Sequence, residues 1–382
     1  MLNKPILPGA TLGILGGGQL GRMFTIAART MGYKVMVLDP DSYSPAGQMA
    51  DVHLQADYDD HGALRKMGEA SAAVTTEFEN VPASSLIELS RYCRVAPNAD
   101  AVAIVQDRSR EKSWLKDNGF ATAPFSLITS SDDLQVAASA TGFPAILKAS
   151  RFGYDGKGQI RVDSQTQLAA AFVELKGAPC VLEGLVKLDS EVSVVLARND
   201  TGECACYPTG ENHHRNGILD VTIVPARVKA GLAVQAQEQA RAVADKLNYV
   251  GTLGVEFFLA GSRLLVNEIA PRPHNSGHYT LDACVVDQFE QQVRALCGLP
   301  LGDTRLLSPV VMVNLLGDVW RPTPDWLALL KHPGIRLHLY GKLEARPGRK
   351  MGHYNCLGET LESSLKLADD TRLALGISAT SN

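Results

Sequence analysis

A glycine-rich turn near the start of the chain constrains the fold more than any other segment. Residues 16–18 are all glycine, and they follow a short apolar run over residues 11–15. A helical pattern of apolar residues begins at Leu20, and a second apolar run over residues 34–38 ends at Asp39. Because glycine allows a tight passage from a strand into a helix, this order predicts a βαβ unit with parallel strands.

The same turn carries a spacing that is typical of dinucleotide-binding sites, with glycines at 16, 18 and 21 and an acid at the end of the next strand. The physical requirement is broader, because glycines and a helix N-terminus suit any anion that approaches the backbone N–H groups. Three interpretations stay open. The turn holds a phosphorylated substrate or nucleotide with help from Arg22, it holds a nicotinamide dinucleotide, or it is a tight turn without a ligand.

Strand and helix patterns alternate over the first hundred residues, which predicts a doubly wound parallel sheet. The pattern then changes to two short helices over residues 101–119 and to mostly extended segments over residues 181–224. Further on we expect a helix over residues 281–296 and a last, smaller unit after a linker between Pro300 and Pro309. At about 150 residues per domain, 382 residues correspond to two or three domains.

Composition excludes several functional classes. The chain has 37 Lys and Arg against 41 Asp and Glu, a net charge of −4, whereas proteins that neutralise nucleic-acid phosphates are usually basic. No apolar run approaches the ~20 residues of a membrane span, and the first residues lack the apolar stretch of a secretory signal. Seven cysteines without a C-x-x-C pair indicate reduced thiols. We expect a cytoplasmic protein that binds neither nucleic acid nor membrane.

The middle of the chain carries a candidate polyphosphate site. Lys148 ends an apolar strand, and a glycine-rich loop over residues 152–158 follows it. Such a loop can close over phosphates while the lysine supplies a charge, although the spacing is not that of a P-loop. Glu183 ends a strand that resembles a hinge for an adenine base. A solvated strand end is the alternative for Lys148. Glu191 begins another apolar strand, and an exposed structural acid is the alternative there.

Two later acids predict a metal site. Glu256 and Glu268 each interrupt an apolar strand, and a turn over residues 260–262 joins the two strands. Antiparallel pairing would place the acids opposite each other with Asn267 nearby, and like charges so close need a cation between them. Carboxylate and amide oxygens together with substrate phosphates suit Mg²⁺. A pair of salt-bridged acids is the alternative.

Two polar segments complete the set of candidates. Residues 270–279 form a dense polar loop in which Arg272 could pair with phosphate or bicarbonate oxygens, and the alternative is a hydrogen-bonded surface loop. Residues 346–350 contain two arginines and a lysine on a Pro-Gly turn, with Glu344 as the nearest preceding acid. We expect this cluster to reach the cleft and to face the helix start at residues 18–22, so that the two hold one phosphate. A solvated turn is the alternative.

These motifs, in this order, resemble those of the N5-carboxyaminoimidazole ribonucleotide synthases, a family of ATP-grasp ligases in de novo purine biosynthesis. The resemblance covers nearly the whole chain and rests on four segments: 16–23, 153–159, 267–278 and 346–353. It implies an α/β and α+β protein with a Rossmann-like pre-ATP-grasp domain (1–105), an ATP-grasp domain (106–300, with a lid near 120–185) and a small C-terminal domain (301–382). It also implies a homodimer that joins bicarbonate to 5-aminoimidazole ribonucleotide at the expense of ATP.

The resemblance assigns residues to three sets of ligands. The nucleotide would contact Arg108, Lys148, Gly153, Gly156, Gly158, Gln159, Glu183, Gly184, Leu185, Val186, Glu191, His214, Asn267 and Glu268. Mg²⁺, with Mn²⁺ as the other candidate, would be held by Glu256 and Glu268. Catalysis around bicarbonate would use Tyr154, Asp155, Lys157, Arg272, His274 and Lys350. The ribonucleotide would contact Gly18, Gln19, Leu20, Arg22, Asn275, Ser276, Arg346 and Arg349. Some relatives carry arginine in place of Lys157, which puts a bidentate role at that position in doubt.

Three other functions compete with this interpretation. Another ATP-grasp ligase, such as a glycinamide ribonucleotide synthase or a formate-using transformylase, would share the nucleotide and metal residues and differ around residues 272–278 and 346–353. A nicotinamide-dependent oxidoreductase would explain the glycine spacing and leave the two acids unexplained. A non-catalytic nucleotide sensor would not need so many polar groups in one site.

Overall fold

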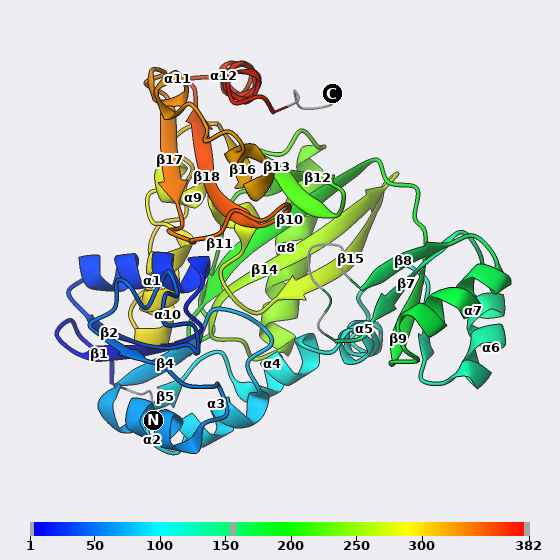
Figure 1. Ribbon diagram of the computed structural model, residues 1–382, viewed down its shortest axis with the longest axis horizontal. Helices are drawn as coiled ribbons and strands as arrows, with labels where there is room; N and C mark the ends of the chain where they lie inside the picture. The colour runs from blue at the N-terminus through cyan, green and yellow to red at the C-terminus, as the bar shows by residue number, and fades with distance from the viewer. Residues whose placement is uncertain (1–3, 152, 154–157, 378–382) are drawn as a thin grey trace.

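The computed structural model describes residues 4–151, 153 and 158–377, and these form three β-sheets with helices packed against them (Figure 1). The first sheet is the expected parallel one, in the order β3-β2-β1-β4-β5. Its strands are β1 (Thr11–Leu15), β2 (Lys34–Leu38), β3 (Val52–Leu54), β4 (Ala73–Thr76) and β5 (Arg94–Val95). Helix α1 (Gln19–Thr30) covers one face, and α2 (His61–Ala70) and α3 (Ala83–Leu89) cover the other. The prediction of a doubly wound parallel sheet is thus confirmed.

Two short helices lead out of this sheet, α4 (Ala99–Val105) and α5 (Arg108–Asp117). Asp107 starts α5 by accepting hydrogen bonds from the backbone N–H groups of Ser109 and Arg110, as an N-cap residue does. A four-stranded antiparallel sheet follows, in the order β6-β9-β7-β8, and we call it the lid sheet. It consists of β6 (Phe125–Ile128), β7 (Ala145–Ala149), β8 (Gln159–Val162) and β9 (Cys180–Gly184), with α6 (Leu134–Thr141), α7 (Gln165–Glu174) and the 3₁₀ turn η1 (Ser131–Asp133). In Figure 1 the lid sheet lies apart from the first sheet, beyond α5.

The largest sheet has nine strands in the described residues, in the order β15-β14-β10-β12-β13-β16-β18-β17, with β11 beside β10. The strands are β10 (Ser190–Arg198), β11 (Cys204–Cys206), β12 (Gly210–Arg215), β13 (Ile218–Val224), β14 (Gly251–Ala260), β15 (Arg263–Ala270), β16 (Val310–Leu316), β17 (Ile335–Leu339) and β18 (Lys350–Leu357). Helix α8 (Ala230–Lys246) packs its buried face against β10 and β14, which fills the largest apolar cluster. The helices after it are η2 (Asn275–Gly277), α9 (Thr280–Ala283), α10 (Gln288–Cys297), η3 (Gly317–Trp320), α11 (Trp326–Leu330) and α12 (Leu361–Ala374).

One expected helix is wrong. Residues 281–296 do not form a continuous helix, because the chain is extended between α9 and α10. Cys284 pairs with Leu306 in an isolated β-bridge. Asp287, the residue before α10, then caps this helix by accepting from the N–H groups of Phe289 and Glu290. Apolar periodicity runs through both helices and does not reveal the break, because the break depends on the bridge from Cys284 to Leu306.

The nine-stranded sheet also runs across the expected boundary at residue 300, because β13 pairs with β16 in an antiparallel ladder. The strands of the last 80 residues therefore share a sheet with those of the preceding segment, and the division of the chain into three domains stays a prediction. In the described part of the chain, no helix combines the length and the apolar character needed to cross a membrane.

Candidate active site

The two acids of the predicted metal site face each other across neighbouring strands. Strands β14 and β15 are antiparallel, and Glu256 is paired with Glu268 in their register, as the sequence predicts. The next pair is Phe257 with Val266, so Asn267 is an additional residue in a β-bulge. A bulge re-aims side chains locally, and this one lies at the point where three oxygen-bearing groups meet.

The electrostatics of this pair favour a bound cation. Burial, together with the charges of Glu268 and Glu191, raises the pKa of Glu256 to about 7. The Asn267 Oδ1 atom is buried and has no hydrogen-bond partner among the described residues. Two carboxylates and an orphaned amide oxygen fit the oxygen preference of Mg²⁺, which keeps several waters and takes its remaining ligands from phosphates. Among the described residues, no three or more His, Cys, Asp or Glu side chains are grouped so that they could hold a metal ion by themselves. A metal ion at Glu256 and Glu268 would therefore need further ligands from water or from the substrate.

Two lysines surround one acid where the lid sheet meets α5. The Lys148 Nζ atom of β7 lies 2.9 Å from Glu183 Oε2 of β9, and Lys112 Nζ of α5 lies 3.5 Å from the same oxygen. Burial alone would raise the pKa of Glu183, but the two ammonium groups hold it at about 2. Burial lowers the pKa of Lys148. Glu183 Oε1 has no partner within the described segments, so one oxygen of this carboxylate remains available.

A pocket of about 330 Å³ opens between β10 and β12, and its lining includes two residues predicted to contact the nucleotide. These are Glu191 and His214, whose Oε2 and Nδ1 atoms lie 2.9 Å apart. Burial opposes the charged imidazole, yet the carboxylates of Glu191 and Glu256 raise the pKa of His214 above its ordinary value. The pocket therefore places a carboxylate and an imidazole within ion-pair distance of each other, next to the metal-site acids.

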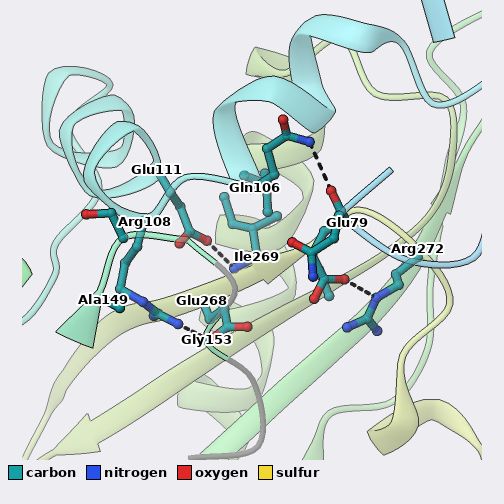
Figure 2. A pocket seen from close by; sticks show the side chains of 13 residues that line it. Glu79, Gln106, Arg108, Glu111, Ala149, Gly153, Glu268, Ile269 and Arg272 are labelled. Carbon is teal, nitrogen blue, oxygen red and sulfur yellow. Dashed lines mark hydrogen bonds and ion pairs between the residues drawn. The ribbon is translucent and has the colours of Figure 1, made fainter. Parts of the chain in front are cut away.

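Arg272 and Arg108 both line the cleft that contains Glu268, and the Arg272 guanidinium already has a carboxylate partner (Figure 2). Its Nε atom lies 2.6 Å from Glu79 Oε2, while Arg108 Nη2 lies 3.5 Å from Glu268 Oε2. Sequence reasoning missed Glu79. A signal existed, because Glu77 and Glu79 follow the carboxyl end of β4, the edge of a parallel sheet where ligands usually bind.

The loop after β15 organises itself through side-chain hydrogen bonds. His274 Nε2 lies 3.4 Å from Glu256 Oε1, and its Nδ1 lies 2.8 Å from Ser276 Oγ. Burial lowers the pKa of His274 well below its ordinary value, so the imidazole is neutral near pH 7. Asn275 exchanges two amide hydrogen bonds with Asn314, and Ser276 accepts one from Ser193. The side chains of Asn275 and Ser276 are buried and hold the loop to the sheet. Their contact with substrate stays a prediction.

The glycine turn differs from the expected phosphate site. The N–H groups of Gly18 and Gly21 donate to the two carboxylate oxygens of Glu77, and Gly17 N–H donates to Asp39 Oδ2 at 2.6 Å. These carboxylates occupy the positions that a phosphate or a dinucleotide would need at the start of α1. In this structure the chain supplies the carboxylates that these N–H groups bind, and contact of residues 18–22 with a substrate stays a prediction. Leu20, another expected contact, has its side chain in the core beneath α1.

The basic segment near residue 350 does lie against α1, through a residue that the sequence did not single out. Lys342 Nζ donates to Gln19 Oε1 at 2.5 Å and to the Lys350 carbonyl at 2.7 Å. Burial raises the pKa of Glu256, and Arg272 lowers that of Glu79 against the effect of burial; the charge of Lys350 adds a smaller lowering effect at both carboxyls. Arg346 instead pairs with Glu344, the nearest preceding acid, at 3.0 Å in an exposed ion pair, so the charge of the cluster is partly neutralised locally.

Only the ends of the glycine-rich loop lie among the described residues. Tyr154, Asp155, Gly156 and Lys157 lie outside the described residues, whereas Gly153 lines the cleft beside Arg108 (Figure 2). Gly158 has a positive φ of 69°, which favours glycine, and Gln159 begins β8. After β9 ends at Gly184, Leu185 is exposed and Val186 is half-buried.

Models of known protein families match three successive regions of the chain. Family models match residues 9–106 (ribonucleotide synthetase preATP-grasp domain), 113–289 (ATP-grasp domain) and 310–366 (phosphoribosylaminoimidazole carboxylase C-terminal domain). The N5-carboxyaminoimidazole ribonucleotide synthase of Bacillus subtilis (strain 168) is 47% identical over 354 residues, which is 92% of this chain and 93% of the relative. The chain belongs to the N5-carboxyaminoimidazole ribonucleotide synthase family.

Solved structures of N5-carboxyaminoimidazole ribonucleotide synthases share the fold over nearly their whole length. An ADP complex of one has a TM-score of 0.93 and 43% identity, and the match covers 97% of this chain and 98% of the other. A second, from Aspergillus clavatus in complex with ADP and 5-aminoimidazole ribonucleotide, has a TM-score of 0.88 and 30% identity over 96% and 98% of the two chains. The family and the fold inferred from the sequence are confirmed, and the nicotinamide-dependent alternative has no support in these matches.

Proposed function

We propose that this chain is an ATP-dependent ligase that carboxylates 5-aminoimidazole ribonucleotide with bicarbonate, giving N5-carboxyaminoimidazole ribonucleotide, ADP and phosphate. The observation that carries the proposal is the Glu256–Glu268 pair with the orphaned Asn267 oxygen, in a cleft whose lining also includes Arg108 and Arg272. The relatives' activity and the solved complex with ADP and the ribonucleotide support the same substrates.

The reaction needs no nucleophile from the protein. A bicarbonate oxygen attacks the γ-phosphorus of ATP and ADP leaves, which gives carboxyphosphate. The exocyclic amine then attacks the carboxyl carbon, phosphate leaves, and the amine loses a proton. The residues of the chain bind, orient and neutralise, which is the usual demand of phosphoryl transfer. Closure of the site over the substrates would keep water from a labile mixed anhydride.

We assign the residues as follows. Lys148 and Arg108 balance the charge of the nucleotide phosphates, and Glu191 with His214 binds the nucleoside part in the 330 Å³ pocket. Arg272 and Lys350 bind bicarbonate and the anion formed from it. Mg²⁺ held by Glu256, Glu268 and the Asn267 amide would neutralise the transferred phosphoryl group. Neutral His274 serves as a hydrogen-bonding group beside Glu256. The homodimer and the cytoplasmic location are further parts of this proposal and rest on the family.

The experiment is a phosphate-release assay in which each component is withheld in turn. We expect release that requires ATP, Mg²⁺, bicarbonate and 5-aminoimidazole ribonucleotide together, and ¹³C-bicarbonate should give a carbamate signal on the ribonucleotide. Glycinamide ribonucleotide with formate is the matched alternative substrate set. Turnover of that set, and none with aminoimidazole ribonucleotide, would assign the chain to a different ligase.

A further inference from the structure

Strand β15 has an open edge at the metal-site residues, and α5 fills it with two side chains. β15 is the outermost described strand of its sheet, so its outer backbone groups have no strand to pair with. Lys112 Nζ donates to the Asn267 carbonyl at 2.9 Å, and Glu111 Oε1 accepts from the Ile269 N–H at 2.6 Å (Figure 2 shows the second contact). Consecutive residues of one helix thus hold the backbone on both sides of Glu268.

Lys112 also contacts the lid sheet. Its ammonium is fully buried and lies 3.5 Å from Glu183 Oε2, the oxygen that pairs with Lys148 at 2.9 Å. One charged group therefore lies between a backbone carbonyl of the nine-stranded sheet and a carboxylate of the lid sheet. Both partners border the cleft, because Asn267 is the bulge residue next to Glu268 and Glu183 is the partner of Lys148.

A purely structural role does not explain this arrangement. A buried ion pair contributes little net stability, because desolvation offsets most of its attraction, and an apolar side chain of similar volume often serves packing as well. A backbone clamp on a bulge has a different effect, since it fixes the direction in which the bulge and its neighbour present their oxygens. Supporting residues of this kind are what hold metal ligands in orientation.

We propose that Lys112 is a positioning residue that fixes the Asn267 bulge and couples it to the Glu183–Lys148 pair of the lid sheet, with Glu111 as the second point of the clamp. The metal ligands and the nucleotide-binding cations are thereby held in one geometry across two sheets. The inference rests on the proposed nucleotide site, and it adds residues that touch neither the nucleotide nor the metal in that proposal.

The test compares Lys112→Met, Lys112→Arg and the control Lys116→Met, which changes an exposed lysine on the same helix. Calorimetric titration with ADP, with and without Mg²⁺, gives a readout that needs no turnover. We expect Lys112→Met to weaken Mg²⁺-dependent ADP binding by about 10- to 100-fold, the range for loss of a charged hydrogen bond. Lys112→Arg should recover part of this loss, and Lys116→Met should bind as the unaltered protein does. Unchanged Mg²⁺-dependent binding in folded Lys112→Met would overturn the proposal.

Hydrogen exchange on the unaltered protein keeps the proposal testable if Lys112→Met does not fold. Addition of Mg²⁺ and ADP should slow exchange in residues 266–270 of β15 and residues 180–184 of β9 together. Protection of one segment without the other would show that the two sheets are not coupled through Lys112. If Mg²⁺-ADP binds and both segments respond, but aminoimidazole ribonucleotide is not carboxylated, the coupling stands and the proposed reaction fails.

Discussion

Arg272 and Glu79 form an ion pair of 2.6 Å between Nε and Oε2, although 193 positions separate them in the chain. The pair joins the loop after β15 to the carboxyl end of the first, parallel sheet. Arg272 holds the pKa of Glu79 below its ordinary value, although burial alone would raise it. The guanidinium therefore has a fixed orientation before any anion arrives, and Glu79 is what fixes it.

The first prediction concerns this orientation. Arg272→Lys keeps the charge but loses the planar fork, so bicarbonate-dependent phosphate release should fall by about 10- to 100-fold. Glu79→Gln should raise the KM for bicarbonate, because the guanidinium loses its charged partner. Steady-state kinetics at varied bicarbonate measure both effects. Full activity of Arg272→Lys would mean that only the charge is needed.

The second prediction concerns the paired acids. Glu256→Gln and Glu268→Gln should each lower Mg²⁺-dependent turnover by at least ~100-fold, the effect of losing a key electrostatic group. Without Mg²⁺ the stability of Glu256→Gln should exceed that of the unaltered protein. The raised pKa of Glu256 makes its ionisation costly in the folded state, and this cost grows as the pH rises from its unfolded pKa to about 7. The difference in Tm should therefore be larger at pH 8 than at pH 5, and a reversed order would contradict the assignment.

The third prediction separates two basic residues of the C-terminal segment. Lys350→Ala should lower kcat/KM for aminoimidazole ribonucleotide by about 10- to 150-fold, because we assign its ammonium to the anion in the cleft, and its charge already acts on the carboxyls of Glu79 and Glu256. Arg346→Ala should change it less than about threefold, because Arg346 is 70% exposed and paired with Glu344. Equal losses in the two variants would place the ribonucleotide along the exposed turn instead.

The fourth prediction concerns the cofactor. Mg²⁺-ATP should raise Tm and NADH should not, because Asp39 and Glu77 already accept the N–H groups of the glycine turn. Ligand binding at a hundredfold excess over Kd stabilises a protein by about 2.7 kcal/mol, which a thermal-shift titration detects. A shift with NADH alone would revive the dinucleotide interpretation.

The fifth prediction tests the turn itself. A Cβ added at Gly18 would lie 2.5 Å from Glu77 Oε1, so Gly18→Ala should destabilise the protein by about 1–3 kcal/mol. Gly231→Ala is the matched control, since nothing lies within 4 Å of its added Cβ inside α8. That change should stabilise by about 0.5–1 kcal/mol, because alanine is the better helix former. Chemical denaturation of the two variants measures the contrast.

Local patterns predicted the parts of the site that lie close together in the sequence. The turn that joins the two strands was predictable, and so was the approach of Glu256 to Glu268. The turn alone does not set their pairing, because register counted from the pair Ala260–Arg263 would place Asn267 opposite Glu256, and the bulge at Asn267 brings Glu268 there instead. The family resemblance supplied most of the remaining assignments. The break between α9 and α10 was not predictable, because a bridge to Leu306 and a cap at Asp287 decide it rather than hydrophobic periodicity.

Residues whose role depends on a distant partner were missed. Glu77, Glu79, Lys112 and Lys342 act on groups 56 to 323 positions away, and no short motif encodes such contacts. The glycine turn shows a local pattern whose partner the sequence does not reveal. Its spacing is that of an anion site, and only the fold reveals that Glu77 supplies the anion from within the chain.

The ladder between β13 and β16 has a consequence for dissecting or recombining this enzyme. Residues 221–224 pair with residues 310–313, so a chain ending near 308 would leave β13 as an uncovered sheet edge lined by Val221 and Ile223. Such edges invite pairing with other molecules. Truncations here should aggregate rather than yield a smaller working enzyme, and a C-terminal segment exchanged between relatives would have to be compatible with β13.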